Sequence, residues 1–423
     1  GDQIYRIDGK RALRLKSKDV TDLLKGKKGT QVVVSVRREG EQDLIDFAIV
    51  RDKIQVPSVP YAFKLTNDIG YVKVTRFSGR TGEELEGAIG DLLLQGSQKL
   101  ILDLRGNGGG YLEQAVVVAN QFIEKGRRLV YTEGRYRKSR ENHLGRRDPI
   151  FAPDLPLIVL VDRFSASASE IVAGAIQDYD RGLVVGHTTF GKGLVQKQFY
   201  LKNQGAVLLT IARYFTPSGR PIQRPFSEDR EAYQKEGYDD YDPNVDPDSL
   251  ATKKVYHTRI LKRKVFGGGG ITPDVPVRVD TLVSFARVLI KPKNFSTFLS
   301  YAKRKEAHIL QQYSDFDSFF QSYKPSSREL AEFRSLLNER DVPFTESEFQ
   351  EAVPFIQKQI KQQIAQIRWG NGAEGRVRVQ QDSQVAQAIA LFGQAEELLA
   401  ARASQQGDTE TYGRRQTPYN QVR

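Results

Sequence analysis

The feature that most constrains the fold is a repeated alternation of strand patterns and helix patterns between about residues 56 and 290. The stretch "LPLIVLVD" at 155–162 is nearly continuously apolar, as expected for a strand covered on both faces. Further strand patterns lie at 69–77 and 99–106, and helix patterns lie at 81–96, 111–126 and 169–180. This alternation predicts an α/β domain around a central sheet.

The segments before and after residues 56–290 have other residue patterns, which indicate further domains. At 423 residues, the chain is longer than one hydrophobic core usually supports, so we expect two or three domains. Residues 1–55 alternate as strands around one short helix, with Ser17 as its expected N-cap and a hairpin turn near Gly40. Residues 225–266 are polar and rich in Tyr and Asp, which predicts a surface insertion within the α/β domain of residues 56–290.

The C-terminal part is predicted to be helical. Residues 291–402 repeat helical spacing, and we expect Pro354 to interrupt one of these helices or to begin a new one. Residues 403–423 lack apolar periodicity, which predicts a disordered tail.

Composition excludes several kinds of chemistry. The chain has no cysteine, so disulfides, a cysteine nucleophile and thiolate metal sites are excluded. No apolar run is long enough to span a bilayer, and we expect any signal or membrane anchor to lie outside this chain. The net charge of +12 could attract nucleic acid or another anionic surface, but the basic residues are dispersed and no nucleic-acid-binding module accompanies them.

Three serines at every second position stand out in "DRFSASASEIVAGAIQD", residues 162–178. Ser167 and Glu170 fit a capping box, which by itself is a structural explanation. The small alanines between the serines, however, indicate that another group approaches this backbone closely. A serine at a strand-to-helix junction also lies beside unpaired N–H groups that can stabilise an oxyanion, and the amide of Ala168 is one candidate donor.

A nucleophilic serine needs a base, and the sequence offers two. A lysine can act as a base near neutral pH where burial among apolar groups lowers its pKa. Lys192 lies in "TFGKGLVQ" between two glycines, a setting that predicts burial, and Gln196 follows at a spacing that places both on one face of a strand. His187 is the alternative base, since a Ser–His pair is also compatible with the sequence.

Five motifs occur in an order and spacing that carry a family resemblance. They are "LDLRGNGGG", "SASASEIVAGAIQD", "TFGKGLVQ", "ARYFTPSGRPIQ" and "GGGGITPDV". Together they resemble the C-terminal processing peptidases (tail-specific proteases), which are serine endopeptidases with a Ser–Lys dyad and a PDZ domain. The resemblance implies a crotonase/ClpP-like protease core. The insertion and the helical C-terminal region look like the variant found in Bacteroidetes-type bacteria.

Carried over by position, the resemblance implies a catalytic set. Ser167 would be the nucleophile, Lys192 the general base 25 residues later, and Gln196 the assisting residue. The oxyanion hole would consist of the amide of Ala168 and that of Gly108 or Gly109. Asp103 and Arg105 are expected to hold the glycine-rich loop rather than to react.

The resulting hypothesis is a serine endopeptidase that cleaves proteins near their C-termini, in the periplasm or cell envelope, without a metal or organic cofactor. The alternative is a catalytically silent, protease-like scaffold for protein interactions. Residues 1–55 resemble the latter part of a PDZ domain, so we expect an incomplete peptide-binding groove there. The expected partners are protein or peptide tails and not nucleic acid. The helical region is expected to support a homodimer or an adaptor.

Overall fold

The computed structural model describes residues 2–38, 40–202, 205–225, 254–278 and 282–406. The chain divides into two compact units. The first joins Gly1–Val56 with Leu282–Arg378, and the second joins Pro57–Thr281 with Val379–Arg423. Each unit is therefore assembled from two separate stretches of chain. Among the helices described, none combines the length and the apolar character needed to cross a bilayer.

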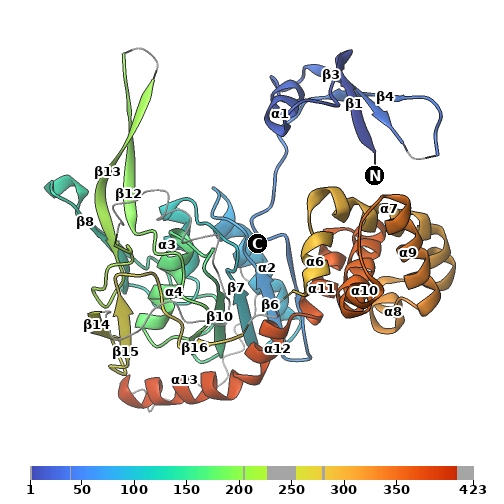
Figure 1. The fold of residues 1–423 in the computed structure, drawn as a ribbon. Helices are drawn as coiled ribbons and strands as arrows, with labels where there is room; N and C mark the ends of the chain where they lie inside the picture. The colour runs from blue at the N-terminus through green and yellow to red at the C-terminus, as the bar shows by residue number, and fades with distance from the viewer. Residues whose placement is uncertain (1, 39, 203–204, 226–253, 279–281, 407–423) are drawn as a thin grey trace. The chain divides into compact units, whose positions relative to one another are not determined.

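The second unit contains the α/β core that the alternation predicts (Figure 1). Its main sheet has the strand order β16-β11-β10-β7-β6-β5. All neighbouring pairs are parallel except β5 with β6. The bounds are β5 Tyr61–Lys64, β6 Ile69–Lys73, β7 Lys99–Asp103, β10 Leu157–Val161, β11 Leu183–Gly186 and β16 Val275–Pro276. Every residue of β10 is buried, which explains its apolar sequence.

Helices cover the sheet through two separate apolar clusters. One cluster includes buried residues of α2 (Thr81–Leu94), α3 (Leu112–Ala119) and α4 (Ala168–Asp178). All residues of α4 are buried. The other cluster joins sheet residues such as Ile101 and Ile158 to α12 (Ser383–Ala390) and α13 (Phe392–Gln406). The last two described helices are thus part of the α/β core.

A second sheet of four strands has the order β12-β13-β8-β9. Its strands are β8 Arg128–Glu133, β9 Glu141–Leu144, β12 Leu194–Tyr200 and β13 Ala206–Phe215, and a short 3-10 helix, η1 (Arg137–Ser139), separates β8 from β9. The β12–β13 hairpin extends away from the core as a long projection (Figure 1). Of the predicted insertion, residues 226–253 lie outside the described part, while β14 (Lys254–His257) and β15 (Lys264–Gly267) pair as a hairpin.

The first unit contains a small sheet of the order β2-β1-β3-β4. It consists of β1 Gln3–Ile7, β2 Lys10–Arg11, β3 Gln31–Arg37 and β4 Ile45–Val50, with α1 at Ser17–Leu24. Its core is formed by Ile7, Val32, Val34 and Val36. Ser17 is the first helical residue and Lys16 is the N-cap, so the predicted cap was placed one residue too late.

The first unit also contains the helices α6 to α11. They are α6 Ser284–Leu289, α7 Pro292–Gln312, α8 Phe316–Ser322, α9 Ser327–Glu339, α10 Glu346–Trp369 and α11 Asn371–Gln380, whose last two residues fall in the second unit. The prediction that Pro354 breaks a helix was wrong, because α10 runs through it. Burial of Phe349, Ile356 and Ile360 in one cluster stabilises α10 enough to offset the roughly 3 kcal/mol cost of an interior proline.

Candidate active site

The three sequence segments predicted to form the site follow three neighbouring parallel strands. The glycine-rich loop follows β7, the serine-rich turn follows β10, and the segment from His187 to Gly193 follows β11. Because β7, β10 and β11 are adjacent and parallel, these segments meet at one edge of the sheet. Ligands of open α/β sheets usually bind at this edge, beyond the carboxyl ends of the strands.

Ser167 lies at a strained turn directly before α4. Its φ of 55° and ψ of −109° belong to a region that residues other than glycine rarely adopt. The N-terminus of α4 follows at once, and Ser167 is its N-cap residue, as predicted. A serine held in this way presents its hydroxyl next to the first N–H groups of a helix, which is the arrangement of a nucleophile elbow.

The glycine-rich loop approaches this turn closely at Gly109. A Cβ placed on Gly109 would lie 2.7 Å from the Ala166 carbonyl oxygen and 2.8 Å from Ser167 Cβ. Its φ of +96° also favours glycine. The Gly109 N–H donates to Asn107 Oδ1 at 2.9 Å. At Gly108 an added Cβ would meet no atom within 4 Å.

The two serines that flank Ser167 bind the backbone of the glycine-rich loop. Ser165 Oγ donates to the Leu104 carbonyl at 2.9 Å, and Ser169 Oγ donates to the Asn107 carbonyl at 2.8 Å. Both side chains are fully buried. The alternating serines are therefore explained by two structural hydroxyls on either side of the strained residue.

Glu170 is the residue whose importance the sequence analysis did not identify. Its buried carboxylate accepts hydrogen bonds from the N–H groups of Ser167 at 2.7 Å and of Lys192 at 2.9 Å through Oε2. Through Oε1 it accepts from the Gly191 N–H at 2.7 Å and the Thr189 hydroxyl at 2.6 Å. Burial raises the pKa of Glu170, and these hydrogen bonds oppose that shift. One carboxylate thus links the backbone of the predicted nucleophile to that of the predicted base.

Lys192 does not occupy the buried environment that its flanking glycines predicted. Gly191 and Gly193 are buried, but the Lys192 side chain is exposed, and so is Gln196. Within the residues that the structure describes, the Ser167 hydroxyl and the Lys192 amine are not hydrogen-bonded to each other. The close packing concerns the flanking glycine rather than the lysine, since a Cβ on Gly193 would lie 2.4 Å from the Gln223 nitrogen.

The relation between Lys192 and Gln196 is also altered by an irregularity in the strand. The β12–β13 register shifts between Val195 and Gln196, so simple alternation does not place Lys192 and Gln196 on one face. His187, the alternative base, follows β11 and is half-buried.

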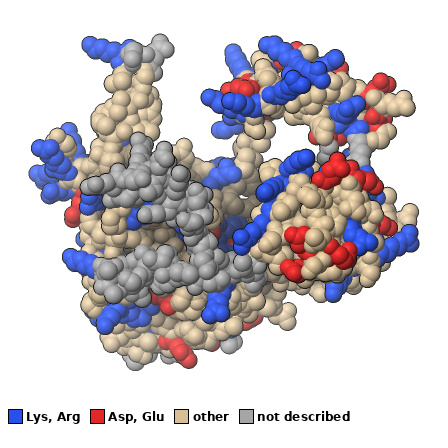
Figure 2. Space-filling model, in the orientation of Figure 1, with Lys and Arg blue, Asp and Glu red and all other residues tan. Residues whose placement is uncertain are grey.

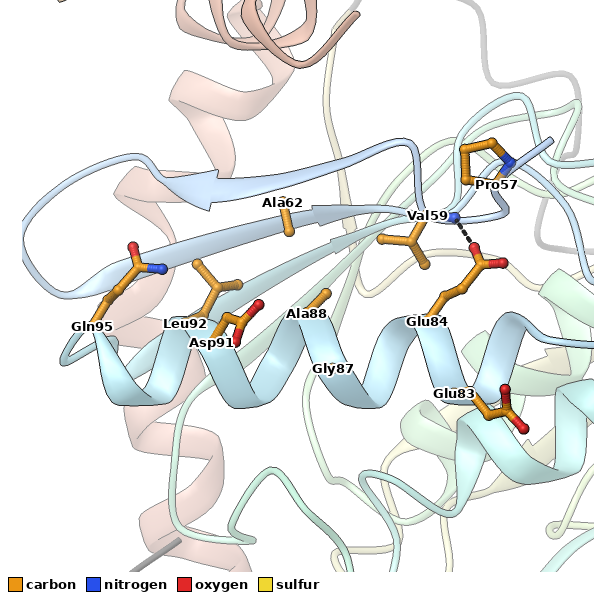
Figure 3. Close-up of a pocket in the computed structure, with 10 residues that line it drawn as sticks. All are labelled: Pro57, Val59, Ala62, Glu83, Glu84, Gly87, Ala88, Asp91, Leu92 and Gln95. Atoms are coloured by element: carbon orange, nitrogen blue, oxygen red, sulfur yellow. Dashed lines mark hydrogen bonds between the residues drawn. The ribbon is translucent and has the colours of Figure 1, made fainter. Parts of the chain in front are cut away.

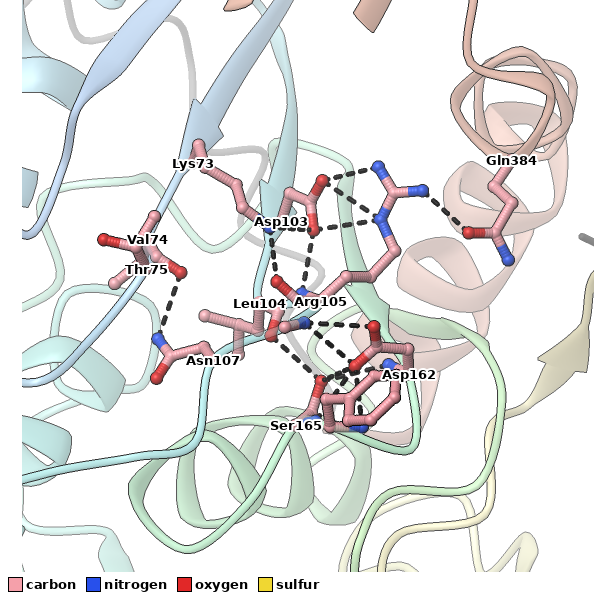
Figure 4. Close-up of polar contacts among 12 residues, drawn as sticks. Lys73, Val74, Thr75, Asp103, Leu104, Arg105, Asn107, Asp162, Ser165 and Gln384 are labelled. Carbon is pink, nitrogen blue, oxygen red and sulfur yellow. Dashed lines mark hydrogen bonds and ion pairs between the residues drawn. The ribbon is translucent and has the colours of Figure 1, made fainter. Parts of the chain in front are cut away.

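A buried charge cluster supports the start of the glycine-rich loop (Figure 4). Asp103 Oδ2 accepts from the Arg105 guanidinium at 2.6 Å and from the Tyr71 hydroxyl at 2.6 Å. Lys73 Nζ donates to Asp103 Oδ1 at 3.0 Å. Burial by itself would raise the pKa of Asp103, but Arg105 and Lys73 hold this pKa well below its ordinary value. Arg105 also donates to Gln384 Oε1 at 2.7 Å, so α12 is connected to this loop.

A groove of about 450 Å³ lies between β5 and α2 (Figure 3). Val59, Ala62 and Leu92 line it, and Glu84 at its end accepts from the N–H groups of Ser58 and Val59. None of the predicted catalytic residues lines this groove. In the described part of the chain, no cluster of His, Asp and Glu side chains could hold a metal ion.

Ser167 lies at a strained helix N-terminus and faces a glycine-rich loop at the carboxyl edge of a parallel sheet. This arrangement is the one found in serine hydrolase sites. Comparison with known proteins points to a family. Residues 68–231 match the model of peptidase family S41. Residues 294–370 match a family of unknown function, DUF8443.

Two named relatives point to the same family. The carboxy-terminal-processing protease of Bartonella bacilliformis is 40% identical over 230 residues, which cover 53% of this chain and 51% of the relative. The carboxy-terminal processing protease CtpA of Bacillus subtilis is 37% identical over 223 residues, covering 53% of this chain and 47% of the relative. The chain therefore spans about half the length of these relatives.

Among solved structures, a photosystem II D1 C-terminal processing protease is similar with a TM-score of 0.40 and 28% identity, covering 66% of this chain and 63% of that one. The match of residues 68–231 and the two proteases named above support the predicted family. The structure confirms the mixed α/β core with its central sheet and the helical C-terminal region. The Bacteroidetes-like variant and the roles of the individual site residues stay predictions.

Proposed function

We propose that this chain is a serine endopeptidase of the carboxy-terminal processing type. The observation that carries the proposal is the strained Ser167 at the N-terminus of α4, joined through Glu170 to the backbone of Lys192. The names of these relatives, which are carboxy-terminal processing proteases, support the substrate class, which is the C-terminal part of a protein.

In the proposed reaction, Ser167 Oγ attacks the peptide carbonyl carbon, and the neutral Lys192 amine takes the hydroxyl proton. The oxyanion receives hydrogen bonds from the amide of Ala168 and that of Gly108 or Gly109. Lys192 then gives its proton to the leaving amine, and water hydrolyses the acyl-enzyme by the same route. Because Lys192 is exposed, we assign to the bound substrate the removal of water from the Lys192 amine. We assign to Gln196 the role of orienting that amine.

The test compares Ser167→Ala and Lys192→Ala with the wild type on a casein-like substrate and on a peptide with an apolar tail. Both variants should lose nearly all turnover while their circular dichroism stays unchanged. Lys125→Ala removes another exposed lysine and should leave activity intact. Cleavage by Ser167→Ala at the wild-type rate would refute the Ser–Lys assignment, and absence of cleavage by the wild type would favour a silent scaffold. Loss of activity in Ser167→Ala and His187→Ala but not in Lys192→Ala would favour a Ser–His pair.

We further propose a PDZ-like role in tail binding for the first 55 residues, a crotonase/ClpP-like core, and a location in the cell envelope. The four-stranded sheet with α1 supports the first of these assignments. We also assign a homodimer or adaptor contact to the helices of the first unit. Sedimentation velocity of the chain with and without residues 282–378 tests that contact.

A further inference from the structure

The projecting β12–β13 hairpin carries apolar side chains that are exposed and that none of the described residues of its own unit covers. Here "the arm" denotes its outer part, residues 197–202 and 205–211. The largest exposed fractions on the arm are 82% for Tyr200, 62% for Leu208 and 50% for Leu209. Phe199, Leu201 and Val207 are exposed as well. Such a set is larger than the isolated apolar residues of an ordinary surface.

These apolar groups lie on both faces of the hairpin. Directly paired residues of antiparallel strands share a face, and Phe199 pairs with Val207 while Gln198 pairs with Leu208. Neighbouring residues along a strand alternate between faces, so Val207 and Leu208 point in opposite directions. A folded partner that packs on one face would leave the other uncovered, whereas a lipid interface surrounds both.

The charge on the arm has a single sign. Residues 194–215 contain Lys197, Lys202 and Arg213 and no acidic residue. Lys197 lies on the edge strand β12, where a lysine disfavours pairing with a strand of a second copy. In Figure 2 the arm appears as a mostly uncharged column with basic residues near its outer end.

A basic turn lies at the base of the arm. Residues 134–140 connect β8 to β9 and contain four basic residues, no acidic residue, and Tyr136, which is 69% exposed. Glu133 pairs with Arg213, and a Cβ on Gly134 would lie 2.1 Å from the Ile211 carbonyl oxygen. The turn therefore projects from the same end of the sheet as the arm and adds positive charge beside it.

We propose that the arm binds an anionic lipid bilayer. Tyr200, Leu208 and their apolar neighbours enter the interface, as tyrosine and leucine do at membrane surfaces. Lys197, Lys202 and the basic turn at 134–140 contact the phosphate headgroups. Lipid binding does not require catalysis, so we expect Ser167→Ala to bind anionic vesicles as the wild type does.

The first test is co-sedimentation of the full chain with vesicles. We expect binding to phosphatidylcholine vesicles that contain a quarter phosphatidylglycerol, weak binding to pure phosphatidylcholine, and release at 0.5 M salt. The double variant Lys197→Gln/Lys202→Gln should lower the partition coefficient roughly 25-fold, at about fivefold for each basic residue near the surface. The control double variant Lys53→Gln/Lys293→Gln has the same net charge as the arm double variant. It should bind vesicles as tightly as the wild type does.

The second test reports on insertion. The chain has one tryptophan, so Trp369→Phe combined with Leu208→Trp gives a single reporter on the arm. Its emission should shift to shorter wavelength with anionic vesicles and be quenched by brominated lipid. The matched control, Leu94→Trp in the same background, places the reporter at an exposed residue of α2 and should show neither effect.

Absence of binding to anionic vesicles would overturn the proposal, as would binding that the arm variants leave unchanged or a Leu208→Trp reporter that lipid does not affect. Sedimentation velocity supplies the remaining outcome. If Leu208→Ser dissociates a dimer and vesicles bind no protein, the arm covers a second copy of the chain and the lipid assignment is wrong.

Discussion

Glu170 binds the backbone on both sides of the proposed dyad, so its shape and charge both matter. Glu170→Gln keeps the size of the side chain but replaces one carboxylate oxygen by an NH₂ group. That group would point at backbone N–H donors, which in the wild type donate to an oxygen. We expect kcat to fall about 100-fold, as for a misplaced catalytic group, with KM nearly unchanged. Glu83→Gln, on an exposed side chain of α2, is the control. Unchanged kcat in Glu170→Gln would show that these hydrogen bonds do not position the site.

Asp103 is the residue at which pH should act on stability. Its folded-state pKa lies below its ordinary value of 3.8, so its contribution to the free energy of unfolding is complete above about pH 4 and is lost as pH falls further. Asp103→Asn should cost roughly 3–5 kcal/mol at pH 7, because Arg105 and Lys73 lose a buried partner. It should also flatten the acid dependence.

Urea unfolding between pH 3 and 7 measures both effects of Asp103→Asn. Asp91→Asn on α2, for whose carboxylate no such cluster is formed in the described structure, should keep the wild-type profile. Equal slopes for wild type and Asp103→Asn below pH 4 would contradict the assignment.

At the scale of elements, the contact between the glycine-rich loop and the start of α4 can be tested with two adjacent glycines. Gly109→Ala would force a Cβ against Ala166 and Ser167 at a positive φ, so one of the two segments must move. We expect kcat/KM for a tailed peptide to fall about 100-fold. Gly108→Ala adds a Cβ in open space and keeps the amide, so activity should change little. Equal activity of the two variants would refute the close contact.

The same elements show what the sequence could and could not predict. The capping box at Ser167 and Glu170 and the α/β alternation are local patterns, and they were sufficient to place the turn and the sheet. Gly191 and Gly193 pack against residues about 30 to 80 positions later while Lys192 between them is exposed, and no local pattern contains those contacts. The bonds from Glu170 to residues about 20 positions later are equally non-local.

For the whole molecule, amphipathic spacing does not reveal which core a helix joins. The residues from 291 to 402 look alike in sequence, yet α12 and α13 pack on the protease-like sheet while α7 to α10 belong to the first unit.

Ala388→Asp would bury a charge beneath that sheet and should lower the free energy of unfolding by roughly 3–5 kcal/mol. Ala386→Asp, exposed on the same helix, should change it by less than about 0.5 kcal/mol. Thermal unfolding distinguishes the two.

The interleaving of the two units has a consequence for how the chain is made. The sheet begins with β5 at residue 61, but α13, which covers one of its faces, ends at residue 406. A ribosome must therefore synthesise every residue from β5 to α13 before that face can be buried. During that interval the sheet is unfinished and the Arg105 guanidinium has not yet met Gln384. The contact between Arg105 and α12 can therefore form only after the helices α6 to α11, which precede α12 in the chain, have been synthesised.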